Sequence, residues 1–273
     1  MNRPNVARVN GIELSYEETG TGPLVVMVMG TGSPGRVWRA HQQPALTKAG
    51  HRVVTFDNRG IAPSSECAEG FTIDDMVADT AALIEHLGGG PAVVVGTSLG
   101  AHITQELALA RPDVVRAAVM IATYGRNTPV QEAISAGERA LYDNKITLPP
   151  EYEAAITAEL NLSPHTLADD RTARDWLDII GFSPQEVTPG VRAQMEIHAH
   201  EGDRLAAYRG ITVPSLVIGF ADDRRLPVRL AREVADAIPG ARYEEVAKAG
   251  HFGYLEQPAE VNRLLLGFLS ALR

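Results

Sequence analysis

One short segment, Gly96-Thr97-Ser98-Leu99-Gly100, constrains the fold of this chain more than any other. It lies between a continuous apolar run at 92–95 and a helix-like stretch at 101–110. A sharp strand-to-helix turn can lift one hydroxyl above a sheet, and it needs small residues two positions before and after that serine because larger side chains would crowd the turn. The pattern also occurs by chance, but its place between a buried strand and a helix favours a turn that presents Ser98 as a nucleophile.

Continuous runs rich in Val and Ile recur along the chain, with helical patterns between them. Such runs are typical of strands buried on both faces, as in a parallel sheet covered by helices. The runs lie at 24–29, 53–56, 92–95, 115–121 and 215–218. Near the N-terminus, Asn10-Gly11 separates two alternating segments, which predicts a hairpin. We therefore predict an α/β fold with a mostly parallel twisted sheet, an N-terminal antiparallel hairpin and flanking helices.

Two of the predicted helices have recognisable ends. Thr72 and Asp75 have the spacing of a capping box, and the amphipathic segment that follows ends at Gly88-Gly89-Gly90. Pro258 occupies a first-turn position before an apolar stripe with three- and four-residue spacing. This last helix should pack on the sheet.

The alternation of strands and helices is interrupted once, between residues 124 and 210. This segment shows helical patterns and Pro/Gly turns but no convincing strand, and the sheet pattern resumes at 213–218. Because the strands on both sides belong to one α/β order, we predict a helical cap at 124–210 inserted into a core made of 1–123 and 211–273.

Composition argues against several classes of protein. The chain has 34 acidic and 25 basic residues, a formal charge of −9, which disfavours nucleic-acid binding. Cys67 is the only cysteine, so an intramolecular disulfide and a Cys-based zinc site are excluded. No apolar run approaches the ~20 residues of a membrane span, and no signal-peptide or lipidation pattern is visible. We expect a cytoplasmic protein with a small-molecule substrate and no nucleic-acid or membrane partner; a homodimer is one option that the sequence leaves open.

A serine hydroxyl needs a base, and the base needs a group that orients it. His251 has the best position of the eight histidines, since it follows a strand-like segment and a loop and precedes the last helix. The acid should leave the end of a strand on the same side as the serine. Asp222 and Asp223 follow such a strand directly, whereas residues 117–130 contain no Asp or Glu.

A second group of residues suggests a metal site. His198 and His200 form a His-Ala-His segment with Glu201 and Asp203 nearby. Histidines two positions apart diverge on a helix, so they cannot easily share one ion. We therefore expect no metal and no cofactor.

Several motifs together resemble the α/β-hydrolase superfamily: the turn at Ser98, the segment 56–60, the cap position and the loop Ala249-Gly250-His251-Phe252. The likeness covers essentially the whole chain outside the cap and implies the α/β-hydrolase fold with a serine nucleophile. The chain order Ser98, Asp223, His251 then gives nucleophile, acid and base. We interpret Asp57-Asn58-Arg59-Gly60 as a structural turn that braces the loop beside the site.

The family's acid loop usually reads Gly-x-x-Asp-x-x-x-Pro. Counting back from Pro227 selects Asp223, while counting forward from Gly219 selects Asp222 as an alternative acid. We prefer Asp223 because Val213-Pro214 and Pro227 fix the frame from both sides.

The family's oxyanion loop usually reads His-Gly, where this chain has Met29-Gly30-Thr31-Gly32. Oxyanion donors are backbone N–H groups, so the resemblance still implies a hole made by the N–H groups of Thr31 and Leu99. Met29-Gly30, with the segments 96–101 and 103–105, is also similar to polyketide methylesterases of the aclacinomycin type. That likeness does not identify a substrate.

These residues predict a serine hydrolase that cleaves an ester, thioester or lactone through an acyl-enzyme on Ser98. Aromatic residues of the predicted cap suit a medium-sized apolar or aromatic guest, although each could equally belong to the core of the cap. They are Tyr124, Tyr142, Tyr152, Trp176, Phe182 and Tyr208. Two alternatives remain on the same scaffold. One is a non-hydrolytic, cofactor-free lyase, cyclase or bond-forming enzyme of specialised metabolism, and the other is a non-catalytic ligand sensor.

Overall fold

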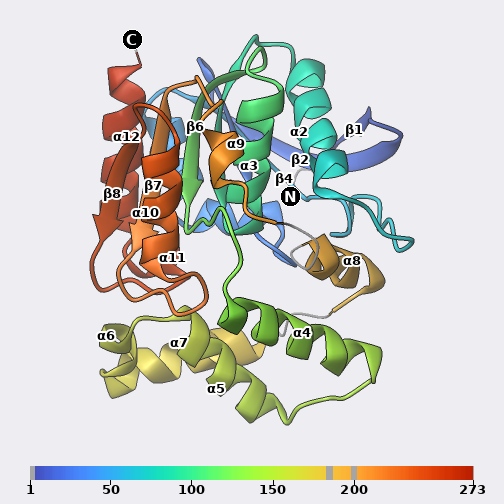
Figure 1. The fold of residues 1–273 in the computed structure, drawn as a ribbon, viewed down its shortest axis with the longest axis vertical. Coiled ribbons are helices and arrows are strands. Elements are labelled where there is room, and N and C mark those ends of the chain that lie inside the picture. The colour runs from blue at the N-terminus through green and yellow to red at the C-terminus, as the bar shows by residue number, and fades with distance from the viewer. Residues whose placement is uncertain (1–3, 183–186, 198–201, 273) are drawn as a thin grey trace.

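The computed structural model describes residues 4–182, 187–197 and 202–272. Within these ranges, eight strands form one sheet in the spatial order β1-β2-β4-β3-β5-β6-β7-β8 (Figure 1). The strands are β1 (Asn5–Val9), β2 (Ile12–Thr19), β3 (Leu24–Val28), β4 (Arg52–Phe56), β5 (Ala92–Thr97), β6 (Val115–Ile121), β7 (Ser215–Phe220) and β8 (Arg242–Val246). β2 pairs antiparallel with β1 and β4, and all other neighbours are parallel. This confirms the predicted sheet.

The predicted turn joins the first two strands. Asn10 and Gly11 have φ values of 48° and 78°, so both occupy the left-handed region that a type I′ turn requires. Glycine enters that region freely, and asparagine enters it more readily than most residues. The Asn10 side chain also donates to Asp79 Oδ1 at 2.8 Å, which ties the hairpin to the adjoining helix.

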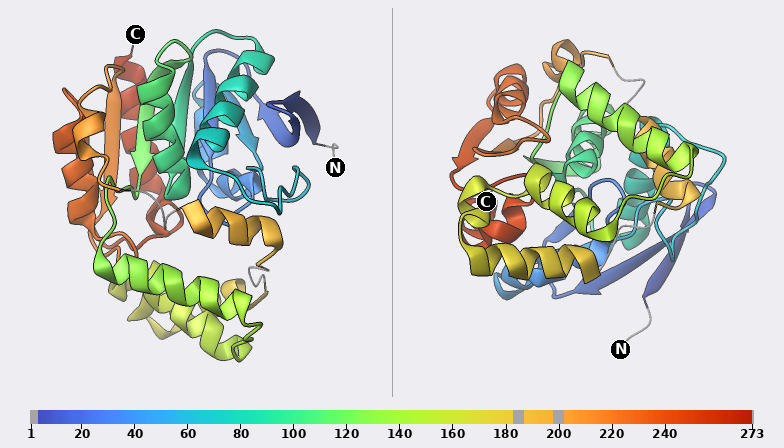
Figure 2. Two further views of the ribbon diagram at one scale, coloured as in Figure 1. Left: turned by 45° about the vertical axis from the view of Figure 1, so that its right-hand side comes forward. Right: turned by 90° about the horizontal axis from the view of Figure 1, so that it is seen from below.

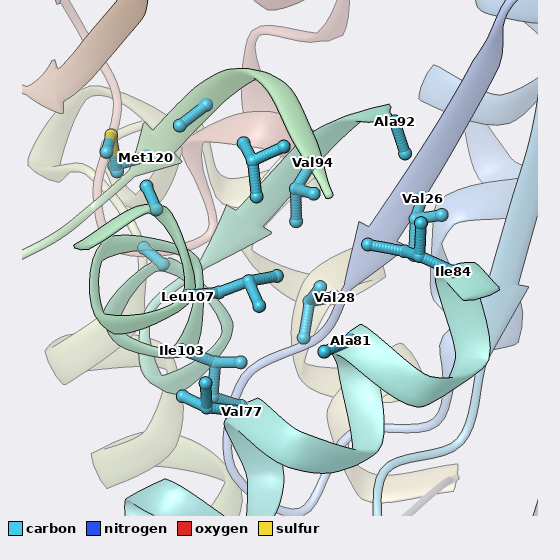
Figure 3. Packing of buried hydrophobic residues seen from close by; sticks show 14 of the residues in the cluster. Val26, Val28, Val77, Ala81, Ile84, Ala92, Val94, Ile103, Leu107 and Met120 are labelled. Carbon is cyan, nitrogen blue, oxygen red and sulfur yellow. The ribbon is translucent and has the colours of Figure 1, made fainter. Parts of the chain in front are cut away.

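Helices cover both faces of the sheet, as Figure 2 shows. The core helices are η1 (Gly35–Ala40), α1 (Gln42–Lys48), α2 (Ile73–Leu87), α3 (Leu99–Ala110), α10 (Val228–Ala237), α11 (Gly253–Glu256) and α12 (Pro258–Ala271). Val26 and Val28 of β3 pack in a cluster with α2, α3 and α10, whereas Val25 and Met27 pack with α1 and α12. Because side chains alternate between the faces, a strand buried on both sides has a continuous apolar sequence. Figure 3 shows the first of these clusters.

The ends of α2 and α12 are those that the sequence predicts. The Thr72 hydroxyl accepts from the Asp75 N–H, and the Asp75 carboxylate accepts from the Thr72 N–H, so the capping box is complete. Gly88 ends α2 in the left-handed region at φ 55°. Pro258 is the first residue of α12, where its missing N–H costs no helical hydrogen bond.

In its described residues, the segment between β6 and β7 contains helices and loops but no strand. It contains α4 (Pro129–Asp143), α5 (Pro150–Asn161), α6 (Pro164–Leu167), α7 (Asp170–Phe182), α8 (Pro189–Ile197) and α9 (Leu205–Tyr208). Helices α4 to α7 gather beyond one end of the sheet (Figures 1 and 2). The assignment of 124–210 as a cap inserted between 1–123 and 211–273 stays a prediction. No helix in the described ranges is long and apolar enough to cross a membrane.

A buried ion pair links the loop after β4 to α2. The guanidinium of Arg59 donates to Asp79 Oδ2 at 2.5 Å and to Oδ1 at 2.7 Å, and both side chains are almost fully buried. The guanidinium also lies over the ring of Phe71, 5.4 Å from its centroid. Removing one partner of such a pair leaves the other charge buried without compensation.

We expect Asp79→Ala to lower the free energy of unfolding by about 3–5 kcal/mol, because the buried Arg59 charge would lose its bidentate partner and keep the more exposed Asp75 carboxylate, 4.0 Å away. Urea unfolding followed by circular dichroism measures this loss. Glu260→Ala is the control, since it breaks an exposed pair with Arg263 on α12 and should have a much smaller effect. Equal stability of Asp79→Ala and the native chain would show that the Arg59 charge does not need this partner.

Candidate active site

Ser98 lies in the turn between β5 and α3, with φ 54° and ψ −122°. This conformation is strained for any residue other than glycine, and such strain persists only where the surroundings enforce it. The Ser98 N–H donates to the carbonyl of Ile121 at 3.0 Å, and the Ser98 carbonyl accepts from the N–H groups of Ala101 and His102 at 2.9 and 3.1 Å. The backbone thus makes the sharp turn that the sequence predicts.

Two glycines make this turn possible. A Cβ on Gly96 would overlap the carbonyl oxygen of Gly100, and a Cβ on Gly100 would overlap that of Val28. Since these obstacles are backbone atoms, no side-chain movement can relieve them. The first turn of α3, which begins with Leu99, therefore lies directly against the end of β3.

Asp223 and His251 are in direct contact. His251 Nδ1 lies 2.8 Å from Asp223 Oδ2, and both side chains are buried. The other oxygen, Asp223 Oδ1, accepts from the N–H of Leu226 at 2.7 Å. Asp222 instead accepts from the Ser163 hydroxyl at 2.6 Å. The geometry therefore favours Asp223 over Asp222 as the acid that orients His251.

The three predicted catalytic residues share one edge of the sheet. Ser98 follows β5, Asp223 follows β7 and His251 follows β8, and these strands run parallel through β6. The structure makes the contact between His251 and Asp223. Within the described residues, it makes no hydrogen bond between Ser98 Oγ and the His251 ring. Nucleophile–base hydrogen bonds are often long before substrate binds and tighten in the complex.

The loop after β3 passes close beside Ser98. A Cβ on Gly30 would lie 3.1 Å from Ser98 Cβ and 3.6 Å from Ser98 Oγ. Thr31, one predicted oxyanion donor, follows Gly30, and Leu99, the other, follows Ser98. The structure thus brings the segments of both predicted donors to the nucleophile, and their role as an oxyanion hole stays a prediction.

Three side chains from other segments hold this loop. The hydrogen bonds run from Asn58 Nδ2 to the Met29 carbonyl (3.0 Å), from the Gly35 N–H to Asp57 Oδ1 (2.8 Å) and from the Gly32 N–H to Gln194 Oε1 (2.8 Å). Asp57 and Asn58 therefore brace the loop structurally, as predicted for the segment 57–60. Burial raises the pKa of Asp57, although the Gly35 N–H and nearby arginines act in the opposite direction.

Glu256 ties the loop of His251 to the junction between α5 and α6. One carboxylate oxygen accepts from the Gly250 N–H at 2.7 Å, and the other accepts from the Ser163 N–H at 2.8 Å and the Thr166 hydroxyl at 2.5 Å. Burial raises the pKa of Glu256 above its ordinary value of 4.5, and the charge of Asp222 acts in the same direction. Glu256 is not predictable from the sequence, because no local pattern connects it with Ser163 and Thr166, which are distant along the chain.

The aromatic residues predicted for the cap differ in their surroundings. Tyr124 and Tyr208 are buried, and Tyr124 stacks on His102 with 5.4 Å between the ring centroids. Phe182 is 90% exposed and Tyr152 is 55% exposed. Tyr124 and Tyr208 thus belong to core packing, the alternative that the sequence left open.

A metal site is not visible in the part of the chain that the structure describes. There, no three His, Cys, Asp or Glu side chains are grouped so that they could hold an ion. His198, His200 and Glu201, which the sequence analysis considered as ligands, lie outside the described residues.

Comparison with known proteins places the chain in a family. A family model described as "Alpha/beta hydrolase family" matches residues 25–264. The chain belongs to the alpha/beta hydrolase family. The match extends from β3 into α12, which confirms the resemblance seen in the sequence and the predicted fold.

Individual proteins are similar to this chain in sequence and in structure. A Mycobacterium tuberculosis protein named "Putative non-heme bromoperoxidase BpoC" is 47% identical over 96% of this chain and 99% of its own length. A crystal structure with that name has a TM-score of 0.92 at 45% identity, covering 100% of this chain and 98% of the other. The enol-lactonase from Burkholderia xenovorans has a TM-score of 0.83 at 26% identity, covering 97% of this chain and all of the other. The resemblance to aclacinomycin-type methylesterases stays a prediction.

Glu256→Gln should weaken the attachment of the His251 loop. The amide NH₂ of the glutamine would face one of the N–H groups from which the carboxylate now accepts a hydrogen bond. Two donors would then face each other, which should lower the free energy of unfolding by about 1–3 kcal/mol at neutral pH. Because the pKa of Glu256 is raised in the folded chain, that chain takes up a proton here before the unfolded chain does. The stability advantage of the native chain over the variant should therefore grow as the pH falls toward 4.5, and then level off.

Urea unfolding of both proteins across this pH range measures the advantage. A difference that shrinks on acidification would contradict the raised pKa, and equal stability at neutral pH would contradict the anchoring role of Glu256.

Proposed function

We propose that this chain is a serine hydrolase that cleaves an ester, thioester or lactone of a medium-sized apolar or aromatic small molecule. The observation that carries this proposal is the buried 2.8 Å contact between His251 Nδ1 and Asp223 Oδ2, at the sheet edge where the strained turn holds Ser98. With Nδ1 engaged by a carboxylate, Nε2 is the ring nitrogen that can take a proton. The name of the enol-lactonase neighbour supports the choice of substrate class, because a lactone is a cyclic ester.

The reaction proceeds in two halves. Ser98 Oγ attacks the acyl carbon while His251 Nε2 takes the hydroxyl proton, and the N–H groups of Thr31 and Leu99 stabilise the oxyanion. His251 then gives the proton to the leaving alcohol or thiol, and an acyl-enzyme remains on Ser98. In the second half, His251 takes a proton from water as the water oxygen attacks the acyl carbon; the acyl–Oγ bond then breaks, His251 returns the proton to Ser98 Oγ, and the acid leaves.

The helices between β6 and β7 act as a cap in this proposal. They lie beyond one end of the sheet (Figure 1), so a substrate that reaches Ser98 would pass beneath them. Residues 124–210 then select the substrate, while 1–123 and 211–273 carry the catalytic residues. The partner is a small molecule in the cytoplasm, and the reaction as proposed uses no cofactor.

Ser98→Ala should lower kcat for a simple aryl ester by a factor on the order of 10⁴ to 10⁶, because it removes the nucleophile on which the other groups act. It should also abolish covalent labelling by a fluorophosphonate. Asp223→Asn should lower kcat by a factor on the order of 10⁴, because an amide would favour the wrong tautomer of His251.

Asp222→Asn is the matched control, since Asp222 bonds to Ser163 rather than to the imidazole. It should retain far more activity than Asp223→Asn in steady-state assays. Comparable loss in the two variants would overturn the assignment of the acid. Undiminished turnover by folded Ser98→Ala would overturn the proposed function.

A second candidate reaction is suggested by the 47% identical relative, whose name describes a bromoperoxidase. If hydrogen peroxide attacks the Ser98 acyl-enzyme in place of water, the acyl–oxygen bond to Ser98 breaks and a peracid leaves. The peracid can then oxidise bromide to hypobromous acid, and the carboxylic acid is returned.

This reaction predicts bromination of a phenol that requires peroxide, bromide and a short carboxylic acid together, and that is lost in Ser98→Ala. Absorbance of a brominated dye measures it. Bromination without the carboxylic acid, or bromination that persists in Ser98→Ala, would exclude the acyl-enzyme route.

A further inference from the structure

Gln194 joins three parts of the chain that are distant in sequence. It lies on α8, in the segment between β6 and β7, and its side chain is fully buried. Its Oε1 accepts from the Gly32 N–H at 2.8 Å, and its Nε2 donates to the Arg59 carbonyl at 2.7 Å. Both ends of the amide are therefore used, one on the loop after β3 and the other on the loop after β4.

The hydrogen bond from Gly32 to Gln194 lies next to Thr31, a predicted oxyanion donor. The Gly32 N–H belongs to the peptide that follows Thr31, so its hydrogen bond to Gln194 fixes the plane of that peptide. On the other side, the Met29 carbonyl accepts from Asn58. The Gly30-Thr31 stretch is thus held at both ends, and only the Gln194 end is supplied by the proposed cap.

Two glycines determine how α8 is seated. A Cβ on Gly60 would lie 2.7 Å from the Gly190 carbonyl oxygen, and a Cβ on Gly190 would lie 2.5 Å from the Glu66 carbonyl oxygen. The first turn of α8 therefore approaches the loop after β4 as closely as two glycines allow. This close approach brings Gln194, one turn further along α8, within reach of both loops.

We propose that Gln194 is a positioning residue for the oxyanion hole, so that the loop carrying Thr31 has its working geometry only while α8 is seated. The inference rests on the proposed function, because it assumes that an oxyanion forms beside Thr31. Preorganised backbone donors lose much of their effect when they are displaced, and a misplacement of about 1 Å can cost on the order of 10²-fold in rate.

Gln194→Met tests the proposal, because methionine has a similar length but replaces neither hydrogen bond. We expect kcat for an aryl ester to fall by about ten- to hundredfold while KM changes by less than about threefold. The affinity for a boronic acid, which forms a tetrahedral adduct on serine, should fall by the same factor as kcat/KM. Fluorophosphonate titration of active sites corrects both values for any unfolded protein, so a merely structural role would leave the corrected values unchanged.

Arg192→Gln is the matched control on the same helix. It removes the ion pairs of Arg192 with Asp143 and Glu196 but leaves the contacts of Gln194 in place. It should keep corrected kcat and boronic acid affinity within about twofold of the native values, well short of the loss that a displaced oxyanion donor causes.

Gly190→Ala provides a second test that leaves Gln194 itself intact. The added methyl group would push the first turn of α8 away from Glu66 and Gly60, and we expect the same joint loss of kcat and boronic acid affinity. If Gln194→Met does not fold, Gly190→Ala alone tests the positioning role of Gln194. If the folded variants keep the native values of corrected kcat and boronic acid affinity, this inference alone is overturned. A native chain that neither turns over esters nor reacts with a fluorophosphonate overturns the proposed function as well.

Discussion

The contact between the first turn of α3 and the end of β3 is the constraint on which the site depends. Only the absence of a Cβ at Gly100 lets the helix backbone reach the Val28 carbonyl, and only the absence of one at Gly96 lets the strand turn back on that helix. This packing holds Ser98 in a strained backbone conformation that an unconstrained chain would rarely adopt. It also brings the loop at Gly30 beside the serine, since β3 and β5 are neighbours in the sheet.

The loops that carry Asp223 and His251 are connected through the junction of α5 and α6. The Ser163 hydroxyl donates to Asp222, beside Asp223, and the Ser163 N–H donates to Glu256, which also accepts from Gly250, beside His251. The carbonyl of Asn161 accepts from the Phe252 N–H at 2.9 Å. The segment between β6 and β7 therefore helps to hold the loops of Asp223 and His251.

Several features of the fold are determined by short segments and can be predicted from the sequence. The hairpin at Asn10-Gly11, the capping box at Thr72 and the turn at Ser98 each follow from neighbouring residues, so their chemistry is readable without the fold. The spacing to Pro227 favours Asp223 over Asp222, but both follow the same strand, and it is the contact with the distant His251 that distinguishes them in the structure. The roles of Glu256 and Gln194 are not predictable from the sequence, because Ser163, Thr166, Gly32 and Arg59 come near them only in the folded chain.

The helices of the segment between β6 and β7 differ sharply in how they are attached. α8 buries five of its residues, including Gln194, whereas α4 and α7 bury none. Helices without buried residues can open locally at a lower free energy than helices that are packed into a core. Local unfolding should therefore begin in α4 and α7 before it reaches α8, so the helix that holds the Gly32 loop is better protected from local opening than these two helices.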